Sequence, residues 1–313
     1  MSPAYQHVPV MRDEIVAVFS TVPPGVVVDA TVGGGGHSEA LLASRDDLSV
    51  LGIDRDPDAV AAATARLAPF ADRFHAVQGL FADLQQDIED HLPSFAHVSG
   101  ALFDLGVSSP QLDRPERGFS YRADGPLDMR MDPTAPRSAV DVVNGYATED
   151  LARVLRQYGD ERFAARIARA IVADRPIEST AQLAAIVTEA IPAATRRRGG
   201  HPAKRTFQAI RVEVNAELDQ LPTALDAAIE ATAPAGRIVV LSYHSGEDRI
   251  VKARFRRATG ECQCPPGLPC ACGAVRTVRL VRAPRRPSEA EREANRRAGS
   301  ARLRVAEKIE EAA

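Results

Sequence analysis

Four consecutive glycines follow a short apolar run near the start of the chain. Residues 25–29 read Gly-Val-Val-Val-Asp, and Gly33 to Gly36 come after three further residues. Because β-branched residues favour strands and glycine permits positive φ and close backbone approach to a ligand, this pattern predicts a strand followed by a nucleotide-binding turn. A second apolar run, residues 49–54, also ends in an acid, Asp54, placed to meet the hydroxyl pair of a ribose in a doubly wound fold. Together these features predict half of a nucleoside-cofactor site.

The register of the glycines separates two classes of cofactor. A dinucleotide fingerprint that begins at Gly33 needs a small residue at position 38, which is Ser38, whereas one that begins at Gly34 meets Glu39. Neither register matches the dinucleotide fingerprint fully. Asp29, just before the glycines, would repel a pyrophosphate but suits the ammonium group of a methionine moiety. The turn therefore favours an S-adenosylmethionine methyltransferase over a nicotinamide dehydrogenase, and a flexible turn without a ligand is the structural alternative.

Short apolar runs alternate with helical patterns through the first third of the chain. Helical segments such as residues 57–67 lie between the early runs, which is typical of a parallel sheet in an α/β fold. The expected strands cover residues 26–29, 51–54, 74–78, 100–104 and 237–242.

About 130 residues separate the fourth and fifth expected strands, far more than an ordinary crossover needs. They carry helical patterns at 147–175 and 180–191, with Thr148 and Thr180 as expected N-caps. Residues 205–221 should return the chain to the sheet. The sequence therefore predicts a mostly parallel, doubly wound sheet with an inserted helical domain. The expected division is 1–113 and 205–313 for the catalytic domain, and 114–204 for an inserted substrate-recognition domain.

Charge is distributed unevenly along the chain. The 313 residues carry a net charge of −3, yet residues 249–313 hold 16 Lys and Arg against 7 Asp and Glu. A basic C-terminal region on an acidic body favours a face that meets phosphates, with a solvated helical surface as the alternative. The N-terminus lacks a basic patch followed by an apolar stretch, and no segment reaches membrane-spanning length. A cytoplasmic protein without a membrane partner is expected.

Longer motifs give the chain a specific resemblance. It resembles the bacterial methyltransferases that modify the N4 amine of a cytidine in the decoding centre of 16S ribosomal RNA. The departures from the usual pattern fall at Tyr243 and Gly246. The matching motifs, in order, are His7-Val-Pro-Val10, Asp29-Ala-Thr-Val-Gly-Gly-Gly-Gly-His-Ser38, Asp54-Arg-Asp56, Asp104-Leu-Gly-Val-Ser-Ser-Pro-Gln-Leu-Asp113, Arg117-Gly-Phe-Ser120, Leu127-Asp-Met-Arg-Met-Asp132, His201-Pro-Ala-Lys-Arg-Thr-Phe-Gln-Ala-Ile-Arg211 and Val214-Asn-Ala-Glu-Leu218.

The resemblance implies a class I S-adenosylmethionine-dependent methyltransferase fold and a set of cofactor residues. Backbone N–H groups near the glycines should lie beside the methionine part, where a helix opening at about Ser38 presents free donors. Asp54 should accept both ribose hydroxyls. Phe81 matches an aromatic that packs near the adenine, although a buried core aromatic is an alternative. The full expected set is Gly35, Gly36, His37, Asp54, Phe81, Asp104 and Gln111.

The same resemblance suggests where methyl transfer occurs. Many amino-methyltransferases carry an Asp/Asn-Pro-Pro-aromatic tetrapeptide after strand four, whereas this chain has Asp104-Leu-Gly-Val-Ser-Ser-Pro110 there. We therefore expect Asp104 or nearby carbonyls to accept the hydrogens of the amine, and Tyr243 or His244 to stack on or orient the base. A dedicated general base is not required, since the proton can be lost to water after methyl transfer.

Two cationic stretches are expected to contact RNA phosphates within an assembled or late-assembling small ribosomal subunit. Guanidinium groups suit phosphate because they bind it bidentately. The first stretch consists of Arg196, Arg197, Arg198, His201, Lys204, Arg205 and Arg211. The second consists of Arg285, Arg286, Arg296, Arg297, Arg302 and Arg304.

All the cysteines lie within eleven residues. Four thiols could hold zinc tetrahedrally, but the Cys-x-Cys pairs are tighter than common zinc spacings and methyl transfer needs no metal. Free thiols are therefore expected, with structural zinc as an alternative and disulfides disfavoured in a reducing cytoplasm. The four are Cys262, Cys264, Cys270 and Cys272.

Two other functions are weighed against this one. A non-catalytic ribosome-assembly factor would have little reason to keep both Asp54 and the four glycines. A methyltransferase acting on DNA or on free RNA is the nearer alternative, because fold alone does not fix the substrate. The long motifs in the insert favour ribosomal RNA.

Overall fold

The computed structural model describes residues 8–94, 96–196, 200–262, 264, 267, 271–295 and 297–310. The chain forms two compact units, one made of Met1–Gly106 and Leu218–Ala313 and the other of Val107–Glu217. These boundaries differ from the expected ones after residues 113 and 204. The inserted unit begins at the loop that follows the fourth strand, and it keeps the helix that was expected to lead back to the sheet.

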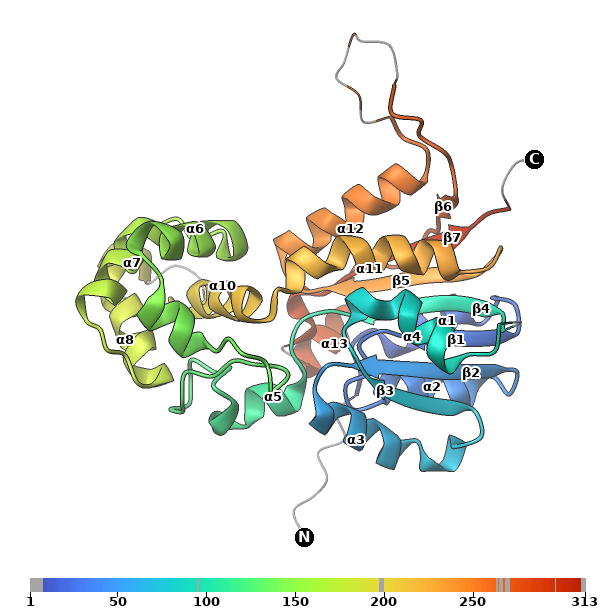
Figure 1. Ribbon diagram of the computed structural model, residues 1–313, viewed down its shortest axis with the longest axis horizontal. Helices are drawn as coiled ribbons and strands as arrows, with labels where there is room; N and C mark the ends of the chain where they lie inside the picture. The colour runs from blue at the N-terminus through green and yellow to red at the C-terminus, as the bar shows by residue number, and fades with distance from the viewer. Residues whose placement is uncertain are drawn as a thin grey trace. The chain divides into compact units, whose positions relative to one another are not determined.

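The first unit is built on a seven-stranded sheet with the strand order β3-β2-β1-β4-β5-β7-β6. Strands β1 to β5 are parallel, and β7 runs antiparallel to both of its neighbours (Figure 1). The expected class I methyltransferase architecture is confirmed. The strands are β1 (Gly25–Asp29), β2 (Leu48–Asp54), β3 (Phe74–Gln78), β4 (Val98–Asp104), β5 (Arg237–Ser242), β6 (Val278–Leu280) and β7 (Arg302–Lys308).

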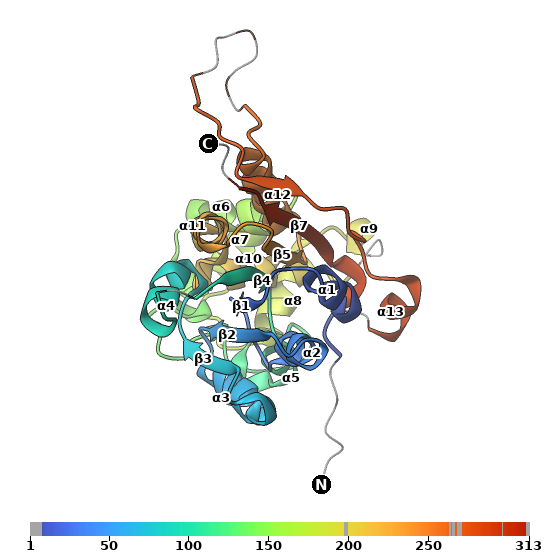
Figure 2. The same cartoon turned by 90° about the vertical axis from the view of Figure 1, so that its right-hand side faces the viewer.

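Apolar residues on both faces of the central strands explain why this sheet is covered on both sides. In β1, Val28 packs into one core cluster and Val27 into the other; Phe103 and Leu102 of β4 divide in the same way. Helices α4, α11 and α12 cover the first face, while α1 and α2 cover the second (Figure 2). Helix α3 packs on β2 and β3. These helices are α1 (Arg12–Phe19), α2 (Gly36–Ser44), α3 (Pro57–Arg66), α4 (Leu84–His91), α11 (Glu217–Ala231) and α12 (Ser245–Ala258).

The antiparallel edge of the sheet was missed by the sequence analysis. Strand β7 reads Arg-Leu-Arg-Val-Ala-Glu-Lys, and its charged positions resemble a solvated helix more than a strand. In the structure, the acidic residue of β7 is paired with cations of both neighbouring strands: Glu307 forms ion pairs with Arg237 of β5 and Arg279 of β6. Short elements complete this unit: η1 (Ala68–Phe70), η2 (Phe81–Asp83), α13 (Glu289–Ala294) and η5 (Ala298–Ser300).

The inserted unit is helical, as expected. Helix α6 packs on α7 and α10, and α7 packs on α8. The expected single helix over residues 147–175 is two helices, because Asp160 takes a left-handed conformation with φ 47° and ends α6. The elements are α5 (Ser109–Asp113), η3 (Pro115–Arg117), η4 (Asp141–Gly145), α6 (Thr148–Gly159), α7 (Ala164–Ala173), α8 (Thr180–Ala190), α9 (Ala193–Arg196) and α10 (Lys204–Asn215).

Both expected N-caps lie one residue too late. Ala147 precedes α6, and Ser179 caps α8 by accepting a hydrogen bond from Gln182 N at 3.3 Å. Thr180 is instead buried, and its hydroxyl donates to Ala123 O while it accepts from Gly125 N. Across the described parts of both units, none of the helices combines the length and the apolar content needed to cross a membrane.

Candidate active site

The carboxyl ends of four neighbouring parallel strands bring three acids together at one edge of the sheet. Asp29, Asp54 and Asp104 end β1, β2 and β4 respectively, and Tyr243 follows β5. The order of the strands reverses between β1 and β4. In an open α/β sheet, ligands bind beside such a reversal, outside the carboxyl ends of the strands.

The glycine turn connects this edge to α2. Gly33 and Gly35 have positive φ values of 51° and 76°, a conformation that side chains rarely adopt. A Cβ at Gly36 would lie 2.5 Å from Pro9 Cγ, so this glycine allows the N-terminal segment to cross the turn. Helix α2 begins at Gly36, two residues before the expected Ser38. Its first backbone N–H groups have no intrahelical acceptor and form a donor set for an anionic group.

Asp29 has an internal role that differs from the expected contact with an ammonium group. Ser38 Oγ donates to Asp29 Oδ2 at 2.7 Å, and Thr31 N donates to Oδ1 at 3.3 Å. The side chain is buried, and burial raises the pKa of Asp29 to about 6. Asp29 therefore holds the glycine turn against the first turn of α2.

Asp54 lies where a ribose-binding carboxylate is expected. Its Oδ2 accepts from Gly33 N and its Oδ1 from Asp56 N, both at 2.9 Å. These two bonds fix the carboxylate, and burial raises the pKa of Asp54 to about 6. Because each carboxylate oxygen can accept more than one hydrogen bond, the fixed group can still accept a pair of hydroxyls.

His37 is the group that most clearly needs a further polar partner. It is only 7% exposed, and neither of its ring nitrogens has a hydrogen-bond partner among the described residues. Its Nε2 lies 3.5 Å from Asp104 Oδ2, beyond a good hydrogen bond. Buried polar groups without partners are rare and costly. The unsatisfied ring lies in the first turn of α2, next to the free N–H groups of that helix, so it can take a polar partner from a ligand.

Asp104 is held in place by Tyr243. The tyrosine hydroxyl donates to Asp104 Oδ1 at 2.7 Å, and Asp104 N donates to Thr31 Oγ1 at 2.6 Å. Burial, reinforced by the charge of Asp104, holds the pKa of Tyr243 well above 10, so the phenol is a neutral donor at physiological pH. The Asp104 side chain is 27% exposed. It is therefore both fixed and open to a substrate.

His244 has a structural task that was not expected. It is the N-cap of α12: its Nδ1 accepts from Gly246 N at 3.2 Å, and its Nε2 lies 3.1 Å from Glu247 Oε1. The buried Glu247 also accepts from Tyr243 N and His244 N through Oε2, at 2.7 and 3.1 Å. This network fixes the backbone after β5, and it favours a capping role for His244 over base stacking.

A cavity of about 280 Å³ lies beside Tyr243 and includes two cationic side chains, Arg286 and Arg302, from the second basic stretch. We call it the Tyr243 cavity. It is lined by Tyr243, His244, Ser245, Arg286, Gly299, Ser300, Ala301 and Arg302. Arg304 of the same stretch instead pairs bidentately with Asp248, and Arg296 lies outside the described residues.

Two expected cofactor residues have structural partners. Phe81 begins η2, is half-buried, and packs against the core with its ring edge-to-face on Phe103 at 6.5 Å. Gln111 belongs to the inserted unit, where its Oε1 accepts from Ser108 N at 3.0 Å to complete the capping box of α5. Their cofactor roles stay predictions.

The first cationic stretch divides into exposed and engaged residues. Lys204 and Arg205 are exposed at the start of α10, and Arg205 Nη1 also donates to Asp160 O at 3.0 Å. Arg196 donates to the carbonyls of Ile191 and Glu189. Arg211 forms a bidentate ion pair with Glu217, with both N–O distances 2.8 Å, and its contact with RNA phosphate stays a prediction. The expected contacts Arg197 and Arg198 lie outside the described residues.

An aromatic stack on the inserted unit was missed by the sequence analysis. The ring of Tyr121 stacks on His201 with centroids 4.6 Å apart, and Arg122 lies over the tyrosine ring at 5.7 Å. The buried ring of Phe207 packs edge-to-face against the ring of Tyr121. Burial and the nearby Arg122 lower the pKa of His201, so its ring is neutral at physiological pH. The two stacked residues are about 80 positions apart in the sequence, so no local pattern links them. Only His201 belonged to an expected cationic stretch.

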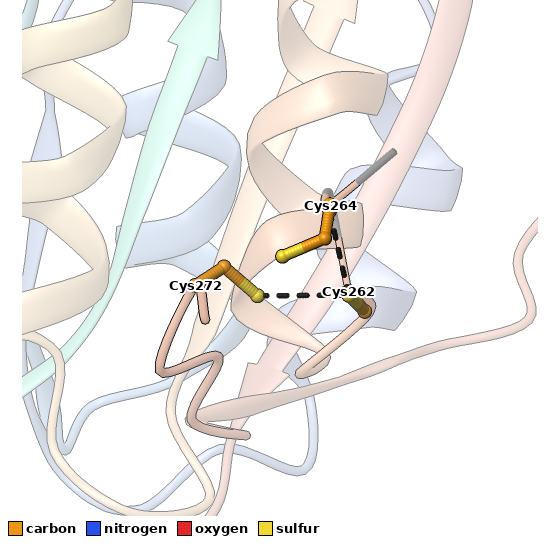
Figure 3. A group of neighbouring side chains, drawn as sticks. All are labelled: Cys262, Cys264 and Cys272. Atoms are coloured by element: carbon orange, nitrogen blue, oxygen red, sulfur yellow. Dashed lines mark hydrogen bonds between the residues drawn. The ribbon is translucent and has the colours of Figure 1, made fainter. Parts of the chain in front are cut away.

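Three cysteines converge in the first unit. The sulfur atoms of Cys262, Cys264 and Cys272 all lie within 4.8 Å of one another (Figure 3). The fourth cysteine, Cys270, lies outside the described residues.

Comparison with known proteins agrees with this geometry. Residues 4–309 match the MraW methylase family. Three proteins named ribosomal RNA small subunit methyltransferase H are similar over nearly their whole length. The one from Acidothermus cellulolyticus is 53% identical over 98% of this chain and 95% of its own, and that from Saccharopolyspora erythraea is 52% identical over 98% and 94%. The one from Carboxydothermus hydrogenoformans is 50% identical over 97% and 98%. This chain therefore belongs to the MraW methylase family and is a methyltransferase of class I fold whose cofactor is S-adenosylmethionine.

Proposed function

We propose that this enzyme methylates 16S ribosomal RNA, at the N4 exocyclic amine of a cytidine in the decoding centre, on small subunits in the cytoplasm. The observation that carries the proposal is the Asp104 carboxylate, fixed by Tyr243 at the sheet edge that also holds Asp54 and His37. The names of the relatives support a small-subunit RNA substrate. The motif resemblance supports the N4 amine.

The chain's own residues account for cofactor binding. Asp54 accepts the ribose hydroxyls, while the first N–H groups of α2 and the ring of His37 bind the methionine carboxylate. Bound S-adenosylmethionine supplies an electrophilic methyl group on a sulfonium. Asp29 keeps the glycine turn in register through Ser38, so it acts by positioning and not by contact.

Asp104 activates the cytosine amine, which is a weak nucleophile. The lone pair of a cytosine amine is delocalised into the ring, so the amine must be activated by groups that accept its hydrogens as the nitrogen becomes pyramidal. Tyr243 occupies Oδ1 of Asp104, which leaves Oδ2 facing His37 and available to the amine. The carboxylate also stabilises the positive charge that develops on the nitrogen. The departing proton then passes to water, which requires no separate base.

RNA is held by two surfaces with different chemistry. The Tyr121–His201 stack offers an aromatic face to an unpaired base. The exposed Lys204 and Arg205, at the start of α10, follow His201 closely in the sequence. A methyltransferase reaches its target base only after the base has left its stack. Arg286 and Arg302 in the Tyr243 cavity suit the phosphate next to such a base. Phosphate contacts make the affinity depend on salt.

The test is transfer of labelled methyl groups from S-adenosylmethionine to small subunits that lack the modification, followed by nucleoside analysis of the RNA. Label in N4-methylcytidine at one decoding-centre position is the expected result. Label in another nucleoside would contradict the proposed target. Cofactor binding without transfer to subunits, tested alongside free RNA and DNA, would favour another nucleic acid. Absence of cofactor binding would favour the assembly-factor alternative.

A further inference from the structure

The four cysteines of the chain lie in the connection between α12 and β6. We call residues 260–276 the cysteine arm. It is closed at its base by a bridge between Thr259 and Arg276 and by Thr277 N donating to Ala258 O at 2.8 Å. None of its described residues is buried. Connections longer than about 12–15 residues are uncommon and are usually functional or disordered. The described residues of this one have no apolar core to hold them.

The sulfur atoms of the arm provide another means of holding it. From their geometry we propose that Cys262, Cys264 and Cys272 bind a zinc ion. Zinc–sulfur bonds of about 2.3 Å in a tetrahedron place sulfur atoms about 3.8 Å apart. The sulfurs of Cys262 and Cys272 are 3.7 Å apart, and Cys264 completes a triangle within 4.8 Å (Figure 3). The distance between Cys262 and Cys272 therefore matches one edge of a zinc–thiolate tetrahedron, and Cys264 lies close enough to bind the same ion after a small adjustment.

Backbone N–H groups point at two of these sulfur atoms. Cys264 N donates to Cys262 Sγ at 3.4 Å, and Ala271 N donates to Cys264 Sγ at 3.3 Å. Such N–H···S bonds orient thiolate ligands and stabilise their negative charge. Gly267 and Gly273 have positive φ values of 86° and 55°, a conformation that glycine adopts readily. The arm thus supplies both the ligands and the donors around them.

Other fates of the thiols fit the geometry less well. A disulfide requires sulfur atoms about 2.05 Å apart, and three converging sulfurs cannot all pair with one another. Three thiolates without a cation would repel one another, whereas a soft or borderline divalent ion neutralises them. The neighbouring acid, Glu261, is already paired with Arg256 and does not compete for the ion. The proposal replaces the expectation of free thiols, and it does not depend on the proposed RNA substrate.

The test is metal analysis of the untagged full-length protein purified without chelators. We expect about one zinc per chain by plasma mass spectrometry, as for a structural site. Cys262→Ser should reduce the zinc content at least fivefold. Val275→Ser, a matched exposed position in the arm with a 66% exposed side chain, should leave it unchanged. Reconstitution with cobalt should give intense visible bands and sulfur-to-metal charge transfer in wild type and Val275→Ser.

Folding of the variants is checked by S-adenosylmethionine binding, which should be unchanged because the arm has no role in the cofactor site. Cys264→Ser and Cys272→Ser provide independent repeats of the cysteine substitution. Removal of zinc should increase the rate of proteolytic cleavage within residues 260–276 several-fold, without cleavage elsewhere. The proposal is overturned by wild-type protein that contains no zinc after reconstitution, by a disulfide among these cysteines, or by zinc that remains in the cysteine variants.

Discussion

The sheet edge of the first unit and the exposed face of the inserted unit present charge in opposite ways. At the sheet edge, the carboxylates are buried or half-buried and each is fixed by specific partners, as Asp54 is by Gly33 N and Asp56 N. On the inserted unit, Lys204 and Arg205 are exposed at a helix start. A small cofactor of constant shape suits a fixed set of donors and acceptors, whereas RNA phosphates can be met by cations that adjust. Substitutions should therefore have large, residue-specific effects at the first site and small, cumulative effects at the second.

The largest effect is expected from Asp104→Asn. An amide has one acceptor oxygen and no charge, so it cannot stabilise the developing positive charge on the amine, and single-turnover methyl transfer should fall about 100-fold or more. Rapid-quench assays with small subunits measure this. Asp226→Asn, which changes an exposed ion pair with Arg254, is the matched control and should keep the wild-type rate. Equal rates for both variants would remove Asp104 from the chemistry.

Tyr243→Phe should have the next largest effect. The ring is retained, but Asp104 loses the hydrogen bond that fixes it, so we expect about a tenfold loss in single-turnover rate, in line with about 1.4 kcal/mol for one hydrogen bond to a charged group. Affinity for S-adenosylmethionine, measured by calorimetry, should change little. A matching loss of cofactor affinity with no change in rate would place Tyr243 in cofactor binding instead.

The pH dependence of cofactor binding should reveal Asp54. Its pKa, raised to about 6 by burial, means that the carboxyl gains a proton as the pH falls below 6. A neutral carboxyl accepts hydrogen bonds from hydroxyls more weakly, so affinity should fall about tenfold between pH 7.5 and pH 5. Asp54→Asn should bind weakly with a flat profile over this range. A profile that stays as steep in this variant would assign the titration to Asp29, whose pKa is also about 6.

The smallest effect is expected on the inserted unit. Combined replacement of Lys204 and Arg205 by alanine should weaken subunit binding about fivefold and reduce the slope of affinity against salt, because fewer counterions are released. Filter binding at several salt concentrations measures both. The matched control replaces Arg166 and Arg169, exposed on α7 of the same unit, and should keep the wild-type slope. A slope that stays unchanged in the first variant would show that this face does not contact phosphate.

The buried strands of the sheet were predictable because their apolar runs end in acids and glycines. The capping role of His244 was not, because it depends on the buried Glu247 and on the backbone path after β5. The partner of Arg211 was missed for a related reason: Glu217 lies six residues away, beyond the spacing of a helix pair, and only the break after Asn215 brings it back. The periodicity of apolar residues predicts which positions are buried. Ion pairs that cross a turn depend on the path of the backbone, which periodicity does not predict.

The hydrogen bond between Tyr243 and Asp104 joins residues 139 positions apart. At translation rates of about 5–20 residues per second, the tyrosine leaves the ribosome roughly 7–28 s after the aspartate. Strands β1 to β4 and the whole inserted unit are synthesised in that interval or before it, and β5 must then pair with a β4 edge that has been exposed throughout. The nascent enzyme therefore carries an open sheet edge while about 130 residues are added, and Tyr243 can reach Asp104 only after about three-quarters of the chain has been made.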